Sequence, residues 1–315
     1  MNNLDDTGNG HLIKVGTRGS ALALTQTGHV IDTLSEANPE VEIDLVIIKT
    51  TGDIDRRQNL VELGVGVYVR ELETALLDRR IDIAVHSLKD MPSSLPPEFA
   101  LAAVPYREDP RDALVSRNGE TLEELPAGSR VATGSARRQA LVKNLRPDLI
   151  VEPVRGNVPI RLAKLDEQDG PDAVILATAG LNRLGLQDRI TQHLSCSSFV
   201  SAVGQGALAL ETRADDSIAI QTASKVNHNG TLFEVTAERA FLDEIGGGCS
   251  APVSAHAKNR NGKITFSAFA STPDGTEVIR ENLVDNAVDA EKIGRNIGKL
   301  FVERGARDLV SEDVN

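Results

Sequence analysis

Residues 15–21 read VGTRGSA, and residues 131–136 read VATGSA. At both places a short apolar run reaches a threonine, and a serine then opens a stretch in which apolar residues recur with helical spacing. A strand followed by a tight turn and a helix predicts a βα unit, with the serine as the residue that caps the helix. Because the same unit occurs twice in 315 residues, the sequence indicates two similar α/β lobes.

Each junction opens a series of strand, helix, strand, helix and strand. In the first series we expect strands at 12–16, 41–49 and 81–86, and helices at 20–36 and 68–79. In the second series we expect strands at 130–132, 149–154 and 173–177, and helices at 135–146 and 158–166. Strands that alternate with helices of this length predict parallel sheets with right-handed crossovers. Ligands of such sheets bind beyond the carboxyl ends of the strands, which is where both junctions lie.

The C-terminal part of the chain has a different pattern. Residues 231–245 read as a helix, with Thr231 and Glu234 in the spacing of a capping box, and another helix is expected at 290–304. Between them, strands are expected at 253–258, 264–270 and 277–280. These elements predict a compact α+β domain with antiparallel strands. A further strand after the glycine-punctuated residues 200–207 can return the chain to the first lobe.

Composition excludes several classes of protein. The mean hydropathy is −0.18, and no apolar run approaches the roughly 20 residues of a membrane-spanning helix. A net charge of −12, seven Phe, two Tyr and no Trp argue against a nucleic-acid binder. Two cysteines, Cys196 and Cys249, are too few for a disulfide scaffold or a cysteine-based metal site. The first ten residues are polar and acidic and do not resemble a secretory signal, so we expect a cytoplasmic protein.

Basic residues are concentrated in one part of this acidic chain. Residues 130–161, which we call the arginine island, hold seven basic and two acidic residues. Such an island suggests a local site for a small polyanion, although solvated helix faces and surface ion pairs would give the same count. Helix N-termini with nearby arginines favour a carboxylate or phosphate, whereas capping alone would explain only the serines. The residues at the two junctions are Thr17, Arg18 and Ser20, and Thr133, Ser135, Arg137 and Arg138.

Two further residues stand where chemistry is expected. Asp90 lies in HSLKDMP (86–92), directly after the third strand, and is the best-placed carboxylate for acid–base or cation-stabilising work. An ordinary turn pair with Lys89 is the alternative interpretation. Cys249 lies in the glycine-rich GGGCSAP (246–252), where a thiol is accessible and suited to chemistry. Cys196 has no comparable setting.

Nine segments, in order along residues 14–256, together resemble the porphobilinogen deaminase (hydroxymethylbilane synthase) family. They are TRGSALA (17–23), HSLKDMP (86–92), REDPRDA (107–113), TGSARRQ (133–139), RGNV (155–158), AGLNRLGL (179–186), VGQGA (203–207), TAERA (236–240) and GGCSAP (247–252). The resemblance implies a transferase of tetrapyrrole (porphyrin and heme) biosynthesis, which joins four porphobilinogens head to tail with loss of ammonia. The product is the linear tetrapyrrole hydroxymethylbilane. The resemblance also implies a dipyrromethane cofactor, thioether-linked to Cys249, in a monomer that needs no metal.

The resemblance also implies a domain division and a set of site residues. The domains would be 1–106 with 203–226, 107–202 and 227–315, the first two being doubly wound lobes like those of periplasmic binding proteins. The third would be a small α+β domain with a three-stranded antiparallel sheet. By the family pattern Asp90 is the catalytic carboxylate, and the cofactor is held by Cys249, Ser87, Lys89, Asp90, Thr133, Ser135, Arg137 and Arg138. The residues implied for the substrate are Arg18, Ser20, Arg155, Arg161, Arg183 and Gln205.

One loop departs from the family pattern. Residues 64–68 read GVGVY, with Glu62 nearby, where the family usually has Gly-Lys-Gly and Phe. This chain therefore lacks the loop lysine, while Tyr68 is in place to stack on a pyrrole. Two alternatives stay open: a family member without activity, and a non-catalytic two-lobed binder of carboxylate-rich ligands. The binder would need neither the Cys249 loop nor the third domain.

Overall fold

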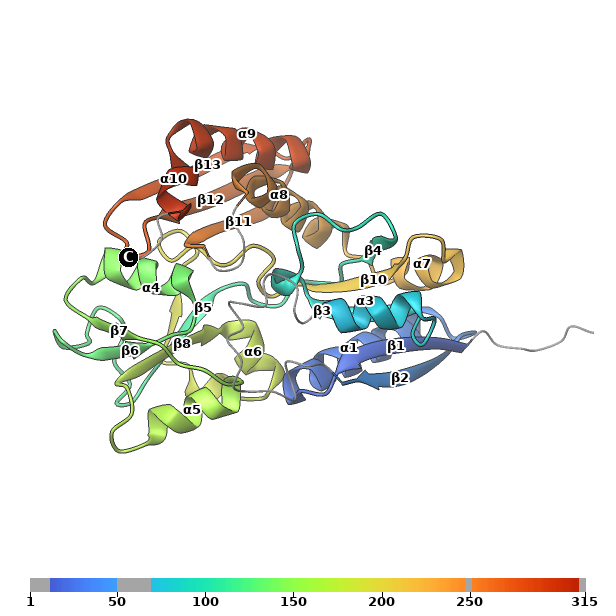
Figure 1. The fold of residues 1–315 in the computed structure, drawn as a ribbon, viewed down its shortest axis with the longest axis horizontal. Coiled ribbons are helices and arrows are strands. Elements are labelled where there is room, and N and C mark those ends of the chain that lie inside the picture. The colour runs from blue at the N-terminus through green and yellow to red at the C-terminus, as the bar shows by residue number, and fades with distance from the viewer. Residues whose placement is uncertain (1–11, 50–68, 247–250, 312–315) are drawn as a thin grey trace, which may run out of the picture. The chain divides into compact units, whose positions relative to one another are not determined.

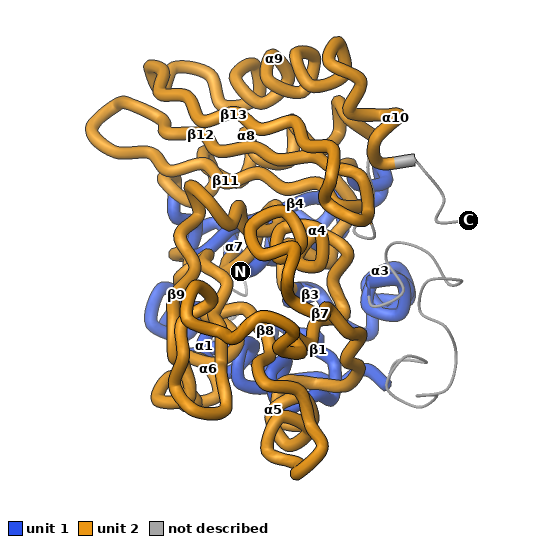
Figure 2. The backbone as a smooth tube through the Cα atoms, turned by 90° about the vertical axis from the view of Figure 1, so that its left-hand side faces the viewer, with its two compact units in different colours: residues 1–86, 95–105, 208–228 blue, residues 87–94, 106–207, 229–315 orange. Residues whose placement is uncertain are grey.

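The structure is a computed structural model that describes residues 12–49, 69–246 and 251–311 (Figure 1). Glu62, the 64–68 loop and Cys249 lie outside the described residues. The chain forms two compact units, shown in blue and orange in Figure 2. Unit 1 comprises residues 1–86, 95–105 and 208–228, and unit 2 comprises residues 87–94, 106–207 and 229–315.

Unit 1 is built on a five-stranded sheet of order β2-β1-β3-β10-β4. Its strands are β1 (Leu12–Arg18), β2 (Glu42–Ile48), β3 (Ile83–Ser87), β4 (Phe99–Ala103) and β10 (Leu208–Arg213). Strand β1 runs parallel to β2 and β3, whereas β4 and β10 pair antiparallel. The helices are α1 (Ala21–Ala37), α3 (Arg70–Leu77) and α7 (Ser217–Ser224). The strand predicted to return to the first lobe is therefore confirmed as β10.

Unit 2 contains a second sheet with a similar arrangement, of order β7-β6-β8-β5-β9. The strands are β5 (Asp112–Ser116), β6 (Arg130–Ala132), β7 (Ile150–Glu152), β8 (Ala173–Ala177) and β9 (Gln192–Leu194). Strand β6 is parallel to β7 and β8, and β5 is antiparallel to β8 and β9. The helices are α4 (Ala136–Leu145), α5 (Val158–Asp166) and α6 (Thr178–Arg183), with short 3-10 turns η1 (Leu88–Asp90) and η2 (Gln187–Arg189). The predicted βαβαβ series is confirmed, while β5 and β9 were not predicted.

The C-terminal part of unit 2 is an antiparallel sheet of order β11-β12-β13. Its elements are β11 (Val253–Arg260), β12 (Lys263–Ser271), β13 (Val278–Asn286), α8 (Asn229–Ile245), α9 (Ala290–Glu303) and α10 (Ala306–Ser311). Phe241 of α8 packs edge-to-face on Phe266 and Phe301, with ring centroids 5.8 and 5.1 Å away. A Cβ at Gly294 would collide with the carbonyl oxygen of Ala237, so glycine allows α8 and α9 to pack this closely. The predicted class of fold, two α/β lobes and a three-stranded antiparallel sheet, is confirmed.

Two details of the prediction were wrong. Helix α8 begins at Asn229, so Thr231 and Glu234 are inside the helix and form no capping box. A spacing of three residues is typical of a capping box, but it equally places two side chains on one face of a helix. In α8 this face contacts the segment before β5 and strand β11. Thr231 Oγ1 accepts a hydrogen bond from Arg107 N at 3.1 Å, and Glu234 Oε1 accepts one from Asn259 N at 3.0 Å. Strand β13 extends to residue 286 because the charged stretch after residue 280 still pairs with β12.

The division into three domains stays a prediction. Among the helices of the described ranges, none has the length and apolar character needed to cross a bilayer.

Candidate functional site

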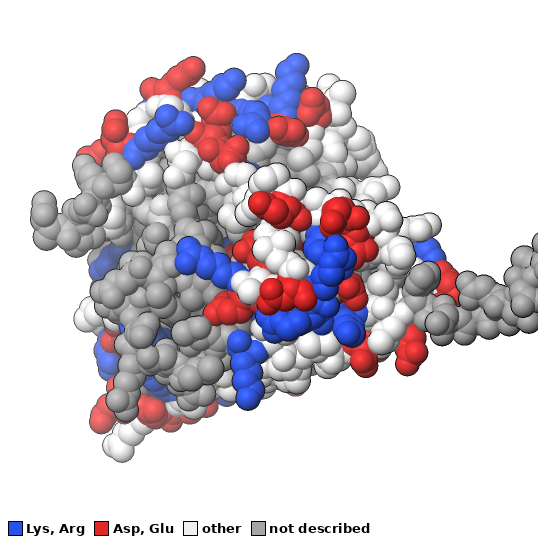
Figure 3. Space-filling model, turned by 45° about the vertical axis from the view of Figure 1, so that its right-hand side comes forward, with Lys and Arg blue, Asp and Glu red and all other residues white. Residues whose placement is uncertain are grey.

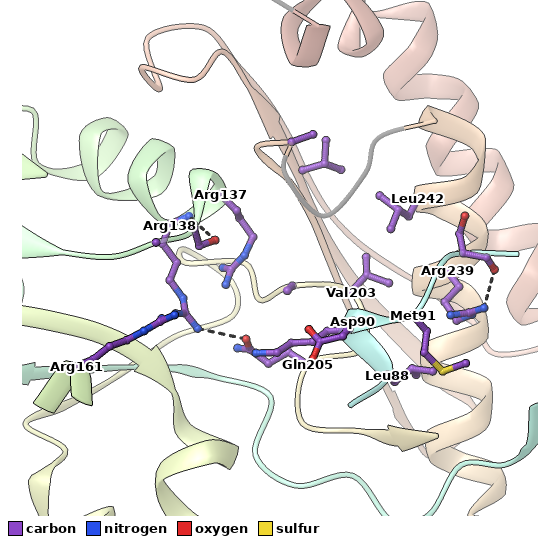
Figure 4. A pocket seen from close by; sticks show the side chains of 17 residues that line it. Leu88, Asp90, Met91, Arg137, Arg138, Arg161, Val203, Gln205, Arg239 and Leu242 are labelled. Carbon is purple, nitrogen blue, oxygen red and sulfur yellow. Dashed lines mark hydrogen bonds between the residues drawn. The ribbon is translucent and has the colours of Figure 1, made fainter. Parts of the chain in front are cut away.

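A pocket in unit 2 collects side chains from six separate segments (Figure 4). The segments are residues 88–93, the beginning of α4, α5, the turn at 202–205, α8, and residues 251–253. Seven of the predicted site residues line it: Lys89, Asp90, Ser135, Arg137, Arg138, Arg161 and Gln205. Residues more than a hundred positions apart in the sequence therefore share one cavity. Ala251, two residues after Cys249, also lines it.

Asp90 enters the pocket on the short η1 turn that follows β3. Leu88 N donates to Ala207 O at 3.0 Å, and the buried Leu88 side chain lies against Gly204. Gly204 has a φ of +70°, and a Cβ there would lie 3.0 Å from the Leu88 side chain, so this turn requires glycine. The turn that carries Asp90 is thus fixed by residues of unit 2.

Helix α8 holds the residues that follow Asp90. Arg239 Nη2 donates to Ser93 O at 2.7 Å, as Figure 4 shows, and Ser93 Oγ donates to Asp243 Oδ1 at 3.3 Å. Arg239 also lines the pocket. Sequence reasoning assigned no role to Arg239; the only available signal was its place in the TAERA segment.

Lys89 has an altered acidity in this setting. Burial lowers the pKa of Lys89 to about 8, and the positive charges of Arg138 and Arg137 act in the same direction. The carboxylates of Asp90 and Asp112 oppose that shift. The amine is therefore mostly protonated near neutral pH and loses its charge on moderate alkalinisation.

Arg137 and Arg138 begin helix α4, which Ser135 caps by accepting a hydrogen bond from Arg138 N at 3.5 Å. Both guanidinium groups are buried and face the carboxylate of Asp112 on β5. Arg137 Nη1 lies 2.7 Å from Asp112 Oδ2, and Arg138 Nε lies 2.9 Å from Asp112 Oδ1. Gln205 Nε2 donates to the same carboxylate at 3.0 Å. Sequence reasoning missed Asp112, although it belongs to the quoted REDPRDA segment.

The arginine island is partly structural. Arg130 Nε donates to Glu152 at 2.8 Å, and Arg146 Nε donates to Asp148 at 2.8 Å. Lys143 Nζ donates to the carbonyl oxygen of Leu149 at 2.8 Å. On the face shown in Figure 3, basic side chains lie beside acidic ones. Arg130 and Arg146 therefore fit the ion-pair interpretation of the island, while its role as a site for a small polyanion stays a prediction.

The other predicted residues lie outside the pocket lining. Thr133 is buried, and its Oγ1 accepts a hydrogen bond from Ser135 N at 3.3 Å. Arg155 is exposed in the turn before α5, and Ser87 ends β3. Arg183 Nη2 donates to Gly206 O at 2.8 Å.

Arg18 and Ser20 belong to unit 1. Arg18 ends β1, and Ser20 caps α1 by accepting a hydrogen bond from Ala23 N at 3.3 Å. The matching junctions of the two lobes are therefore both strand-to-helix turns with a serine cap, as the repeated sequence predicted.

A cavity with one lysine, four arginines and a capped helix N-terminus, built on an α/β scaffold, is typical of a protein that binds a small anionic molecule. Comparison with known proteins identifies the family within this class. The family model described as "Porphobilinogen deaminase, dipyromethane cofactor binding domain" matches residues 13–221, and "Porphobilinogen deaminase, C-terminal domain" matches residues 232–303. The chain belongs to the porphobilinogen deaminase family, and it is an enzyme of that family.

Curated relatives support this assignment over nearly the whole chain. Porphobilinogen deaminase of Syntrophobacter fumaroxidans is 41% identical over 302 residues, which cover 96% of this chain and 97% of the relative. Porphobilinogen deaminase of Alkaliphilus metalliredigens is 41% identical over 304 residues, 96% of each chain. Among solved structures, a YaeC-family lipoprotein of Enterococcus faecalis aligns with a TM-score of 0.42 and 13% identity, over 70% of this chain and 93% of its own. That likeness is too distant to bear on function.

Proposed function

We propose that this enzyme joins four porphobilinogen molecules head to tail, with loss of ammonia, and releases the linear tetrapyrrole hydroxymethylbilane. We further propose that it works on a dipyrromethane cofactor joined by a thioether to Cys249. The observation that carries the proposal is the placement of Asp90 in one pocket with Lys89, Arg137 and Arg138. The family resemblance adds the expectation of a cytoplasmic monomer with three domains.

The pocket suits a ligand with several carboxylates. Each pyrrole of this chemistry carries an acetate and a propionate, so two rings bring four negative charges. Lys89, Arg137, Arg138 and Arg161 line the cavity, and the N-terminus of α4 adds backbone N–H groups there. Of the predicted cofactor residues with neutral donors, Ser135 lines the cavity, whereas Ser87 and Thr133 lie outside its lining. When bound, the dipyrromethane supplies the free pyrrole position to which the first new ring is joined, and each later ring would be joined to the end of the growing chain.

Asp90 has the chemical property that the reaction needs. Loss of ammonia from porphobilinogen leaves a cationic pyrrole, and an adjacent carboxylate stabilises that charge. One opposite charge at about 4 Å, with an effective dielectric constant of about 20, contributes about 4 kcal/mol. Because η1 is fixed by Leu88 and its neighbours, the backbone that carries Asp90 is already in place before substrate binds.

Substrate binding is proposed for Arg18, Ser20, Arg155, Arg161, Arg183 and Gln205. Among them, Arg161 and Gln205 line the pocket. Arg161 Nε donates to Gly156 O at 2.7 Å, which anchors one edge of its guanidinium group beside the cavity. The acetate and propionate of an incoming ring are suitable partners for such groups.

The decisive experiment is the mass of the purified protein and of two cysteine variants. We expect an excess of two pyrrole units on Cys249, and Cys249→Ser should fold yet lose both the adduct and the activity. Cys196→Ser is the matched control and should keep both. Burial raises the pKa of Cys196 to about 11, so its thiol stays protonated and is a poor nucleophile. An adduct on Cys196, or unmodified protein with full activity, would refute the proposal.

The same protein distinguishes the remaining alternatives. An aldehyde reagent for pyrroles should colour the purified enzyme, whereas a non-catalytic binder of carboxylate-rich ligands would stay colourless. A family member without activity would colour but release no tetrapyrrole from added porphobilinogen.

A further inference from the structure

Asp112 is a fully buried carboxylate that faces two arginines of the pocket. Its Oδ2 accepts from Arg137 Nη1 at 2.7 Å, and its Oδ1 accepts from Arg137 Nη2 at 3.2 Å. Arg138 Nε donates to Oδ1 at 2.9 Å, and Arg138 Nη2 lies 2.7 Å from the same oxygen. Asp112 itself does not line the pocket, whereas both arginines do. The carboxylate therefore acts on the cavity through neighbouring residues that line it.

Backbone carbonyls complete the support of the two guanidinium groups. Arg137 Nη1 also donates to Val200 O at 2.8 Å, and Arg138 Nη1 donates to Ile175 O at 2.9 Å. Within the described part of the chain, the Arg137 Nε–H, one Arg137 Nη2–H and one Arg138 Nη1–H are left without a protein acceptor. These remaining N–H groups belong to guanidinium groups whose orientation the other hydrogen bonds already fix.

Gln205 is tied into the same arrangement. Its Nε2 donates to Asp112 Oδ1 at 3.0 Å and to Pro110 O at 2.8 Å, and its Oε1 accepts from Arg138 Nη2 at 3.4 Å (Figure 4). Both ends of the amide are thus engaged. The orientation of Gln205 follows from the charge and position of Asp112.

We propose that Asp112 is a positioning residue, which holds Arg137, Arg138 and Gln205 in the orientation that receives the carboxylates of the pyrrole ligand. The inference rests on the proposed function of this pocket. One buried carboxylate between two guanidinium groups also leaves the cluster with one net positive charge. That charge keeps the attraction for an anion while reducing the mutual repulsion of the arginines.

The charge of Asp112 has a second consequence. Lys89 is surrounded by Asp90, Asp112, Arg137 and Arg138, and Asp112 is one of the two carboxylates that keep its ammonium form favourable. Removal of this charge would lower the pKa of Lys89 further below about 8. A role of Asp112 in folding alone would not change how ligand binding depends on pH.

The test compares Asp112→Asn with Glu152→Gln. Glu152 also pairs with an arginine, Arg130, at 2.8 and 3.0 Å, but neither residue lines the pocket.

The measured quantities are the rate at which apo-protein gains the two-pyrrole adduct from porphobilinogen, and the KM for porphobilinogen against pH. We expect Asp112→Asn to load about 10- to 100-fold more slowly, since misplacement of binding groups has effects of that size. Its KM should also begin to rise at a lower pH than in the parent protein, and Glu152→Gln should match the parent.

The outcomes separate this inference from the proposed function. If the parent protein and Glu152→Gln gain no adduct, the proposed function fails. If they load normally and folded Asp112→Asn loads at the same rate with an unshifted pH dependence, the positioning role is overturned. If Asp112→Asn does not fold, Gln205→Met is tested instead, because it removes the amide that links Asp112 to Arg138 and leaves every charge in place. Gln205→Met should gain the two-pyrrole adduct several-fold more slowly than the parent protein. Adduct formation at the parent rate would equally overturn the inference.

Discussion

Arg107 and Glu238 form a two-point ion pair in the interior of unit 2, with Nη1–Oε1 and Nη2–Oε2 distances of 2.7 and 3.1 Å. Glu238 also accepts hydrogen bonds from Gly204 N at 2.7 Å and from Ala257 N at 2.9 Å. Arg107 Nε donates to Gln205 O at 2.8 Å. The pair therefore joins the segment before β5, the 202–205 turn of the pocket, and the C-terminal α8 and β11.

Removal of the charge of Glu238 should destabilise the protein strongly. Glu238→Gln leaves buried Arg107 with only the more distant carboxylate of Glu234, whose Oε2 lies 3.8 Å from Arg107 Nη1. Loss of one partner of a buried pair usually costs about 3–5 kcal/mol. The free energy of unfolding from urea titration measures this. Glu291→Gln, in the exposed pair with Arg295, is the control and should leave unfolding unchanged. Equal stability of the two variants would contradict the prediction.

The same pair predicts how stability depends on acid. Burial alone would raise the pKa of Glu238, but the charge of Arg107 and the interactions with His256 lower it from 4.5 to about 2. Stability from this group is therefore complete above about pH 4.5, and it is lost as the pH falls toward 2. Unfolding free energies measured between pH 6 and 3 should fall less steeply for Glu238→Gln than for the parent. Parallel slopes would show that folding leaves the pKa of Glu238 unchanged.

Asp90→Asn should separate binding from turnover. The amide keeps the shape of the side chain but removes the charge that stabilises the cationic pyrrole. Loss of about 3–4 kcal/mol corresponds to a fall of about 10²–10³ in kcat, with little change in KM. Steady-state kinetics on adduct-loaded protein measures kcat and KM. Asp215→Asn, at an exposed carboxylate, serves as the control. Near-normal turnover of Asp90→Asn would assign the chemistry to another carboxylate.

Arg239→Gln should affect turnover through the position of Asp90. The substitution removes the 2.7 Å hydrogen bond to Ser93 O that holds the residues after Asp90. We expect kcat to fall about tenfold while the mass of the cofactor adduct stays that of the parent. In Arg239→Lys, kcat should fall less, because the lysine ammonium can still donate to one carbonyl oxygen. A rise in KM at unchanged kcat would instead make Arg239 a substrate-binding group.

The arginines of the island should differ in the stage of synthesis that they support. Arg137→Leu and Arg138→Leu should give largely apo-protein, since assembly of the cofactor needs both. Arg155→Leu and Arg161→Leu should give loaded protein that stalls with partly extended chains, because each added ring brings two carboxylates. Lysine at these places should rescue only partly, since it lacks the two-pronged guanidinium group.

Native mass spectrometry after limited substrate would display the attached pyrroles of each variant. Arg130→Leu is the control within the island, because Arg130 pairs with Glu152 and does not line the pocket. It should give the ladder of the parent protein. If all four island variants gave that same ladder, the island would be structural and would not bind the growing chain.

Several features could be predicted from the sequence because they depend on neighbouring residues. The segments 130–132, 158–166 and 173–177 are observed with the predicted bounds, since their strand and helix patterns are local. Ser20 and Ser135 both cap helices, because a hydroxyl reaches backbone N–H groups only three residues away.

Other features were decided only by the tertiary structure. Strand β5 and its antiparallel pairing with β8 were missed, because its partners are about sixty residues further along the chain. Arg137 and Arg138 were predicted as ligand-binding cations, yet most of their hydrogen bonds go to Asp112, Gln205 and backbone carbonyls. Thr231 was predicted as a cap and instead receives a hydrogen bond from Arg107. Local patterns thus set where strands and helices begin, whereas the partner of a buried charge depends on which elements pack together, because desolvation makes an unpaired charge too costly to bury.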